Sequence, residues 1–421
     1  MFRGALTVAE LFTVVPPGQA FALLAQACSP PGRTEIVTLD RALDRVCAFD
    51  LAAPETLPAF ARATMDGYAV RAADTHGASE QSPAYLELAG DVPTGVVPTL
   101  TVIPRQALRI HTGAMIPAGA DAVVMVEDTN QTGSQIEVLA AAASGENVLT
   151  VGEDIARGAL AIPAGRRLRA ADLGGLAALG LTSVTVRARP RIAILSTGDE
   201  VVAADLTPGA AQVRDVNAAT VAATVERAGG IPVPCGIAPD DEPALLAAAR
   251  AALELGDALV LSAGSSVSVR DLTSRVVDAL GKPGVIVHGI AIKPGKPTVV
   301  ALCDGKPVIG LPGNPASALV VAWRLVRPLV RLLGGETVRD DALGDERELR
   351  AVLDVPLPSR PGREEYVPCL LAAAADGVLH ATPVFGASNL IFTLVRADGL
   401  IAVPLDRSGI AAGEPVRVIV P

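Results

Sequence analysis

The chain has 421 residues, of which 50% are hydrophobic, 19% charged and only 3% aromatic, and its formal net charge is −10. This length predicts roughly two to four domains, and this composition predicts compact, soluble domains and excludes a disordered chain. The negative charge argues against a nucleic-acid partner, which needs a basic face, and no window holds the about 18 uninterrupted apolar residues of a membrane span.

The five cysteines favour a cytoplasmic protein. They are odd in number and scattered, with no CxxC pair, so the sequence indicates neither a disulfide framework nor a thiolate metal site. The short apolar run at 20–28 follows two prolines and a glycine and has an acidic residue upstream, which favours an amphipathic helix over a secretory signal. We therefore expect reduced core cysteines and a cytoplasmic location.

The first half of the chain predicts one domain interrupted by another. Apolar positions at helical spacing occur before the interruption, at 8–11, 18–28 and 39–46, and after it, at 170–179. The residues between them form short apolar runs punctuated by Gly and Pro, a pattern that predicts strands. We therefore expect a mixed helical linker domain made of 1–56 and 152–189, with a β-rich domain inserted at 57–151.

From Arg191 onward, buried strands alternate with helices, which is the pattern of a doubly wound α/β sheet. In such a sheet, ligands bind beyond the carboxyl ends of the strands. Here those ends carry the sequences STGDE, SAGSS, IKPGKP and LPGNP, so we expect these four loops to converge on one edge. We assign this domain to 190–335. Short strands and turns at 336–421 predict a C-terminal β-barrel domain with no chemical cluster of its own.

The converging loops predict a site for a phosphate or another oxyanion. A Gly-Ser-Ser turn at 264–266 offers backbone N–H groups and hydroxyls, and Lys293 and Lys296 add positive charge. Carboxylates at the same edge would repel a bare anion, so they predict a divalent cation between the acids and the phosphoryl oxygens. The alternative for each acid is an ordinary helix N-cap or loop charge. These acids are Glu200, Asp215, Asp240 and Asp271.

A series of motifs extends along nearly the whole chain: TMDGYAV (64–70), RIHTGAMIPAGADAVVMVED (109–128), GEDI (152–155), STGDE (196–200), DVN (215–217), IKPGKP (292–297) and GLPGNPASA (310–318). In sequence and in order they resemble the molybdopterin molybdenumtransferase family, which includes the bacterial MoeA proteins and the gephyrin E domain. The resemblance implies an elongated homodimer of four-domain subunits, with dimerisation through the linker domain, the active site in the cleft between subunits and a central α/β/α domain like that of the molybdopterin adenylyltransferases.

The resemblance also implies a reaction, in which molybdate replaces the AMP of adenylylated molybdopterin with the help of Mg²⁺. Molybdopterin adenylyltransferase and molybdoenzymes are the implied partners. By similarity, Glu200, Asp240 and Asp271 are metal ligands, Lys293 meets the phosphoryl or molybdate charge, and Thr112 makes a hydrogen bond from the partner subunit. The catalytic set is completed by Asp66 and Asp154. The predicted binding residues of the loops are Ser262, Gly264, Ser265, Ser266, Ser268, Arg270, Lys296, Pro312, Gly313, Asn314 and Pro315.

One loop departs from the family pattern. Family members commonly read SGGVSVG followed two residues later by an acid, whereas this chain has SAGSSVSVRD at 262–271, two residues shorter and with Arg270 in place of a glycine. Arg270 either compensates for lost positive charge or signals another oxyanion, such as tungstate. A tungstate-using insertase therefore stands as an alternative, as does a non-catalytic molybdopterin- or oxyanion-binding carrier or sensor. Near the C-terminus, Ser388 lies in a turn where the family frequently has Gly-Ser-His.

Overall fold

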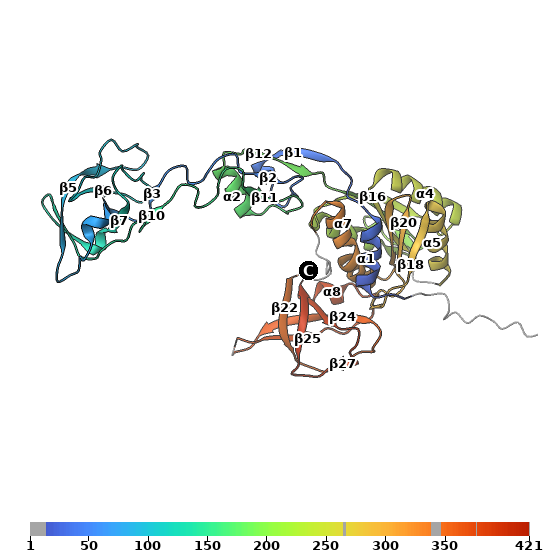
Figure 1. Cartoon of the computed structure of the whole chain (residues 1–421). Coiled ribbons are helices and arrows are strands. Elements are labelled where there is room, and N and C mark those ends of the chain that lie inside the picture. Colours follow the sequence, from blue (N-terminus) through green and yellow to red (C-terminus); the bar gives the residue numbers. More distant parts are fainter. Residues whose placement is uncertain (1–13, 264–266, 338–346, 376, 421) are drawn as a thin grey trace, which may run out of the picture.

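The computed structural model describes residues 14–263, 267–337, 347–375 and 377–420, with the backbone alone at 267–271 and 347. Figure 1 shows an elongated molecule. A β-rich unit lies at one end, a narrow middle unit connects it to an α/β unit, and a β-barrel lies next to the α/β unit. Among the helices of the described residues, none is long and apolar enough to cross a membrane.

The α/β unit contains a six-stranded sheet with the order β16-β13-β17-β21-β20-β18. Four neighbouring strands run parallel, and β20 runs antiparallel to both of its neighbours. Because β20 is reversed, its beginning lies at the same edge as the carboxyl end of β21, where Val299 pairs with Gly310. The strands are β13 (Arg191–Thr197), β16 (Ile231–Ala238), β17 (Ala258–Ala263), β18 (Pro283–His288), β20 (Val299–Cys303) and β21 (Lys306–Pro312).

Helices cover both faces of this sheet. Along β13, Ile192 and Ile194 belong to the core beneath α1, α3, α6 and α7, whereas Ala193 and Leu195 belong to the core beneath α4 and α5. This two-residue alternation of faces explains why the strand is apolar throughout. The helices are α1 (Pro17–Ala27), α3 (Asn217–Arg227), α4 (Glu242–Leu255), α5 (Val267–Leu280), α6 (Pro315–Val321) and α7 (Arg327–Leu333), the last two joined by the π-helix η5 (Ala322–Val326).

The β-rich unit is a six-stranded sheet with the order β7-β4-β6-β5-β9-β8. The middle unit is built from the chain on either side of it: β1 pairs with β12 and β2 with β11, beside α2, while β3 and β10 pair where the two units join. The domain limits themselves stay predictions. The elements are β1 (Thr34–Thr38), β2 (Leu51–Ala52), β3 (Arg62–Ala63), β4 (Gly67–Val70), β5 (Ala84–Val92), β6 (Gln106–Ile110), β7 (Ala122–Met125), β8 (Thr129–Thr132), β9 (Gln135–Val138), β10 (Val148–Leu149), β11 (Leu160–Ile162), α2 (Ala170–Ala178) and β12 (Ser183–Arg187).

The predicted helix at 39–46 is wrong. Only Leu39–Arg41 forms a short 3₁₀ turn, and Asp44 has a left-handed backbone with φ of 60°. The Asp44 backbone N–H, which a helix would use internally, donates instead to the Leu168 carbonyl beyond the inserted unit at 2.9 Å, and just after the predicted helix the Cys47 N–H donates to the Arg166 carbonyl at 2.9 Å. Long-range pairing therefore overrides the local helical pattern.

The C-terminal strands close into a five-stranded barrel in the order β24-β25-β22-β28-β26, with β26 pairing back onto β24. Closure leaves the ring without an edge strand. A short strand of the α/β unit, β19 (Ile292–Lys293), pairs with the beginning of β24 and sets Lys293 opposite Glu365. The barrel strands are β22 (Arg347–Leu353), β24 (Glu364–Ala373), β25 (Leu379–Pro383), β26 (Gly399–Val403) and β28 (Pro415–Val420).

Candidate functional site

The loops after β13 and β16 meet at the carboxyl edge of the sheet, as the sequence predicts. The Thr197 hydroxyl donates to Asp240 Oδ1 at 2.8 Å, and the Asp240 backbone N–H donates to Asp199 Oδ1 at 3.2 Å. Asp240 is half-buried, and Glu200, which follows Asp199, is exposed. Two carboxylates of the predicted metal site, Glu200 and Asp240, therefore lie on two loops that are joined by hydrogen bonds.

A buried asparagine connects three further predicted segments. Asn217 is 7% exposed, and its Nδ2 donates to Ser262 Oγ at 2.7 Å and to the Gly313 carbonyl at 3.0 Å. Sequence reasoning noted the DVN motif but gave Asn217 no role. Asp215 of the same motif accepts the Ala218 N–H at 3.0 Å, so for this acid the capping alternative is confirmed.

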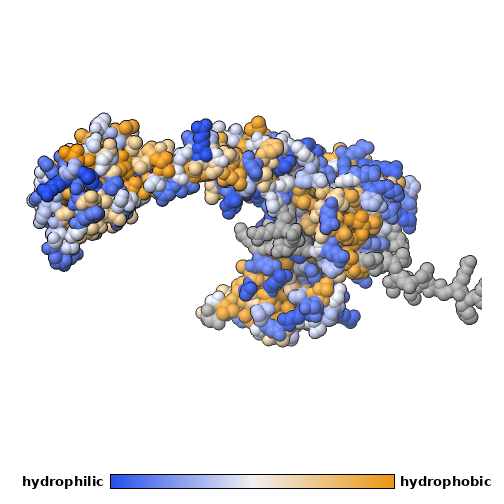
Figure 2. Space-filling view, in the orientation of Figure 1, coloured by the Kyte–Doolittle hydropathy of each residue, from blue (hydrophilic) through white to orange (hydrophobic). Residues whose placement is uncertain are grey.

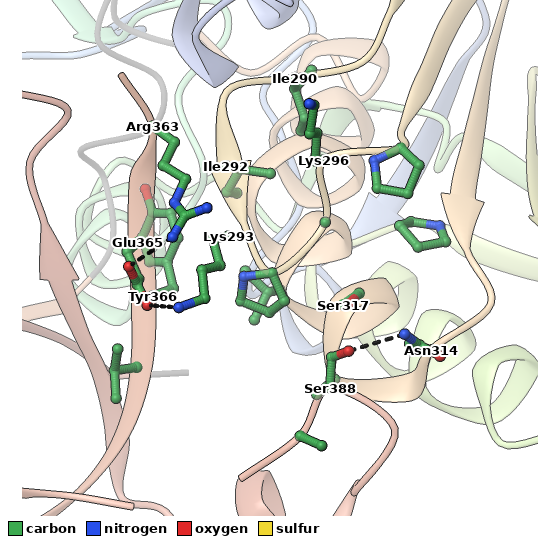
Figure 3. Close-up of a pocket in the computed structure, with 18 of the residues that line it drawn as sticks. Ile290, Ile292, Lys293, Lys296, Asn314, Ser317, Arg363, Glu365, Tyr366 and Ser388 are labelled. Atoms are coloured by element: carbon green, nitrogen blue, oxygen red, sulfur yellow. Dashed lines mark hydrogen bonds and ion pairs between the residues drawn. The ribbon is translucent and has the colours of Figure 1, made fainter. Parts of the chain in front are cut away.

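A cavity of about 1000 Å³ lies between the α/β unit and the barrel. From the α/β unit it is lined by the predicted residues Lys293, Lys296, Pro312 and Asn314. The C-terminal part of the chain adds polar and aromatic residues that the sequence analysis did not assign to the site, and Figure 3 shows Glu365 beside Lys293 and Ser388 beside Asn314. The expectation that the barrel brings no chemical cluster is therefore wrong. These residues are Arg363, Glu365, Tyr366, Phe385, Ser388 and Thr393.

Polar contacts cross this cavity from one unit to the other. Lys293 Nζ lies 2.5 Å from Glu365 Oε1, and Asn314 Nδ2 donates to Ser388 Oγ at 2.9 Å. The charge run at 363–365, within a strand pattern, was the one sequence signal for the barrel's part in the site. The LPGNP loop is anchored through Asn314 and, on its α/β side, through Gly313, while Pro315 begins α6.

Asp66, Thr112 and Asp154 lie away from this cavity within one chain. Asp66 precedes β4 and Thr112 follows β6, both in the β-rich unit at the far end of the molecule (Figure 1). Asp66 Oδ1 accepts hydrogen bonds from the Thr112 backbone N–H at 2.7 Å and from its hydroxyl at 2.9 Å. These bonds, with the nearby His111 and Arg109, hold the pKa of Asp66 below its usual value. Asp154 is exposed on the GEDI turn.

Part of the predicted oxyanion loop lies outside the described residues. This applies to Gly264, Ser265 and Ser266, and to the side chains of Ser268, Arg270 and Asp271. Among the side chains that are described, no group of three His, Cys, Asp or Glu residues could hold a metal ion. Glu200 and Asp240 therefore form at most a two-carboxylate site within that part of the chain.

The fold defines a protein of the MoeA architecture. Residues 15–180 match the MoeA N-terminal region (domain I and II), 193–332 a probable molybdopterin binding domain, and 350–420 the MoeA C-terminal region (domain IV). The chain belongs to the molybdopterin molybdenumtransferase family, and the predicted family and fold class are confirmed.

Curated relatives and solved structures agree over most of the chain. It is 36% identical to a molybdopterin molybdenumtransferase of Nostoc over 92% of this chain and 88% of that protein. It is 35% identical to molybdopterin molybdenumtransferase 2 of Mycobacterium tuberculosis over 94% and 96% of the two chains. A solved molybdopterin biosynthesis MoeA protein from Pyrococcus horikoshii OT3 superposes with a TM-score of 0.82 at 28% identity, covering 97% of this chain and 100% of that one.

Proposed function

We propose that this protein inserts molybdate into adenylylated molybdopterin and releases AMP. Its family membership supports a transferase role in molybdenum cofactor biosynthesis. The observation that carries the specific reaction is the cavity between the α/β unit and the barrel, which has Lys293, Lys296 and Arg363 in its lining and reaches the carboxyl edge of the sheet at the ends of β17 and β21. Cations suit a tetrahedral oxyanion, and the size of the cavity suits a cofactor-sized ligand.

Glu200 and Asp240 are the described residues that fit Mg²⁺. Mg²⁺ is usually bound through one or two carboxylates together with substrate phosphates, and these two acids lie on loops joined by the Thr197 hydrogen bond. The ion would neutralise charge on the phosphoanhydride. Asp271 is the third proposed ligand. Lys293 and Lys296 would orient the oxyanion, and Ser262 and Asn314 would fix the loops that face the pterin phosphate.

The proposed active site also uses a second subunit. Asp66 and Thr112 reach a cavity of the proposed kind only if they come from another chain, since within one chain they lie at the opposite end of the molecule. The middle unit exposes large apolar side chains, which support dimerisation through this region; Figure 2 shows hydrophobic residues over this narrow part. These side chains are Ile36, Leu43, Phe49 and Leu160, 51% to 75% exposed.

The cellular location and the partners of the enzyme are part of the same proposal. We place it in the cytoplasm, with molybdopterin adenylyltransferase as the supplier of its substrate and molybdoenzymes as recipients of its product. The net charge of −10 supports the absence of a nucleic-acid partner. The domain limits at 1–56 with 152–189, 57–151, 190–335 and 336–421 are part of the proposal.

The reaction is tested by incubating the full chain with adenylylated molybdopterin, molybdate and Mg²⁺ and measuring AMP release. We expect AMP to appear only when all three are present, and chelation of Mg²⁺ to stop it. Tight binding of molybdopterin without AMP release would instead identify a carrier or sensor. A parallel assay with tungstate, in which faster AMP release than with molybdate identifies a tungstate-using insertase, settles the choice of oxyanion.

A further inference from the structure

We propose that Glu365 is a built-in counter-anion of the cavity, which weakens oxyanion binding by competing for Lys293 and Arg363. The inference rests on the proposed function, because it concerns the same site and assigns its substrate class, a tetrahedral dianion such as molybdate. Glu365 is then a specificity-determining residue that keeps the oxyanion exchangeable.

Two hydrogen-bond donors and one further cation surround the Glu365 carboxylate. Lys293 Nζ from the α/β unit lies 2.5 Å from Oε1. From the barrel, the Ser359 hydroxyl donates to Oε2 at 2.8 Å, and Arg363 Nη2 lies 3.7 Å from the same oxygen. Glu365 itself is 4% exposed. The carboxylate is therefore a buried anion at the point where the two walls of the cavity meet.

Both cations keep the capacity to bind another anion. The side chains of Lys293 and Arg363 are 51% and 34% exposed, compared with 5% for Glu365. Arg363 Nε is buried and has no hydrogen-bond partner among the described residues, and a buried donor without an acceptor is unfavourable. Figure 3 shows Lys293, Arg363 and Glu365 together on one side of the cavity. An oxyanion that enters there meets two cations that already share one carboxylate.

Glu365 is not free to move away when an oxyanion arrives. Its backbone belongs to β24, where it pairs with Val403 of β26 on one side and Lys293 of β19 on the other. The Ser359 hydrogen bond fixes the carboxylate from a third direction. The bound oxyanion and the carboxylate therefore stay close together, and like charges at such a distance repel each other strongly where water is scarce.

Weakened binding suits a transfer reaction. An interaction that stabilises bound substrate and transition state equally does not raise kcat, and very tight oxyanion binding would leave the transferable species trapped. Lys293, Arg363 and Glu365 together carry a formal charge of +1, and without Glu365 they would carry +2. The carboxylate thus lowers the attraction for a dianion while it keeps the two cations in position.

Glu365 could alternatively act only as a clamp between β19 and β24, and the two roles predict opposite results. If Glu365 acts only as a clamp, Glu365→Gln loosens the loop that carries Lys293 and weakens oxyanion binding. If Glu365 acts as a counter-anion, the same substitution removes repulsion, so we expect roughly tenfold tighter binding of molybdate. Isothermal titration calorimetry of the full chain with molybdate alone measures this affinity. In turnover, KM for molybdate should fall together with kcat.

Glu348→Gln is the matched control, because it removes the same charge from the barrel at an exposed pair with Arg417 outside the cavity lining. It should leave molybdate affinity unchanged. Ser359→Ala tests the idea even if Glu365→Gln does not fold. Without the hydroxyl, Glu365 holds its cations more strongly, so molybdate binding should weaken by about threefold.

Equal or weaker binding by folded Glu365→Gln overturns the inference, as does unchanged or tighter binding by Ser359→Ala, or no molybdate binding by any variant. The proposed function has a separate readout. If the wild type binds molybdate and Glu365→Gln binds it more tightly, but neither releases AMP, the insertase proposal fails and the inference stands. If AMP is released and the two proteins bind equally, the inference fails and the insertase proposal stands.

Discussion

Asn217 donates its side-chain amide to Ser262 at 2.7 Å and to the Gly313 carbonyl at 3.0 Å. One buried side chain at the start of α3 thereby holds the ends of β17 and β21 at a fixed separation. The loops that follow those two strands carry proposed binding residues. The geometry of the proposed site therefore depends on a residue that we do not expect to touch the substrate.

Asn217→Ala should lower the free energy of unfolding by about 1–3 kcal/mol, because the Gly313 carbonyl and the Ser262 hydroxyl lose their buried partner. Asn217→Asp should cost more, since a carboxylate oxygen would then face the Gly313 carbonyl. Urea denaturation of the full chain measures both. Asn130→Ala, at an exposed position of β8, is the control and should change stability by less than about 0.5 kcal/mol. Equal stability of all variants would contradict the assigned role.

The Asp66 carboxyl group gives a prediction about pH. Its pKa is lowered first by the Thr112 backbone N–H and next by the Thr112 hydroxyl. A lowered pKa means that Asp66 stabilises the folded state above its unfolded pKa, and that this contribution disappears as the pH falls through the folded value. Thr112→Val removes the hydroxyl and keeps the N–H, so the pKa of Asp66 should rise part of the way to its usual value.

Carboxyl carbon NMR of protein labelled at aspartate, titrated from pH 6 to pH 2, would follow this group. Thr101→Val, an exposed threonine of the same unit, serves as the control and should leave the Asp66 titration where it is in the wild type. An Asp66 pKa that does not change in Thr112→Val would show that the side-chain hydrogen bond does not affect the carboxylate.

The convergence of the loops was predictable because it depends on local properties of the sequence. Apolar runs such as 192–195 and 258–261 give the strands, and their parallel arrangement brings the residues after them to one edge. The Thr197–Asp240 contact and the two Asn217 contacts, with Ser262 and with the Gly313 carbonyl, confirm this for three of the four predicted loops. The periodicity of apolar residues and the order of the turns were therefore sufficient to predict that the loops lie at one edge of the sheet.

The barrel side of the cavity was not predictable for a physical reason. Lys293 and Glu365 are 72 residues apart, and their contact arises from the pairing of β19 with β24, which joins two units. A two-residue strand such as β19 leaves no periodic pattern to read. The helix predicted at 39–46 failed in the same way, because the Leu39 and Asp44 N–H groups pair with Thr182 and Leu168, more than a hundred positions later.

A half-buried ion-pair network holds the middle unit to the α/β unit. Glu336 Oε1 lies 2.6 Å from Arg331 Nη2, and Oε2 lies 2.8 Å from Arg167 Nη2. Arg167 also donates to the Asp44 and Ala228 carbonyls at 2.9 and 3.0 Å. Burial by itself raises the pKa of Glu336, but the hydrogen bonds and charges of the two arginines outweigh it, and the pKa lies below its usual value.

Glu336→Gln should therefore destabilise the fold by about 2–3 kcal/mol, because two half-buried arginines keep their charge but lose their charged hydrogen-bond acceptor. The wild-type advantage should be present above the ordinary glutamate pKa and decline as the pH falls through the lowered value. Urea titrations at pH 7 and pH 3 test both points. Glu414→Gln, which breaks an exposed pair with Arg407, should cost less than about 1 kcal/mol. A similarly small loss for Glu336→Gln would show that these ion pairs do not stabilise the contact between the middle unit and the α/β unit.

Gly295 lies in the loop that carries Lys293 and Lys296, and it packs closely against Val321 of α6. Its φ is +120°, and an added Cβ would lie 2.4 Å from Val321 Cγ2 and 3.2 Å from Ile292 Cγ2. Alanine at this position must therefore strain the backbone between Lys293 and Lys296 and displace either that backbone or the Val321 side chain. We expect Gly295→Ala to weaken molybdate binding by about tenfold or more, since a shift of about 1 Å in a positioning group has effects of this order or larger.

Gly305→Ala separates displacement from strain. Gly305 also has a left-handed backbone, with φ of +85°, but no atom lies within 4 Å of its added Cβ. This variant should lose about 1 kcal/mol of stability through strain alone and bind molybdate as the wild type does. Calorimetric titration with molybdate, after thermal melts confirm folding, compares the two glycines directly. If Gly295→Ala binds molybdate as well as Gly305→Ala does, the exact path of the loop between the two lysines is not what positions the oxyanion, and charge alone attracts it.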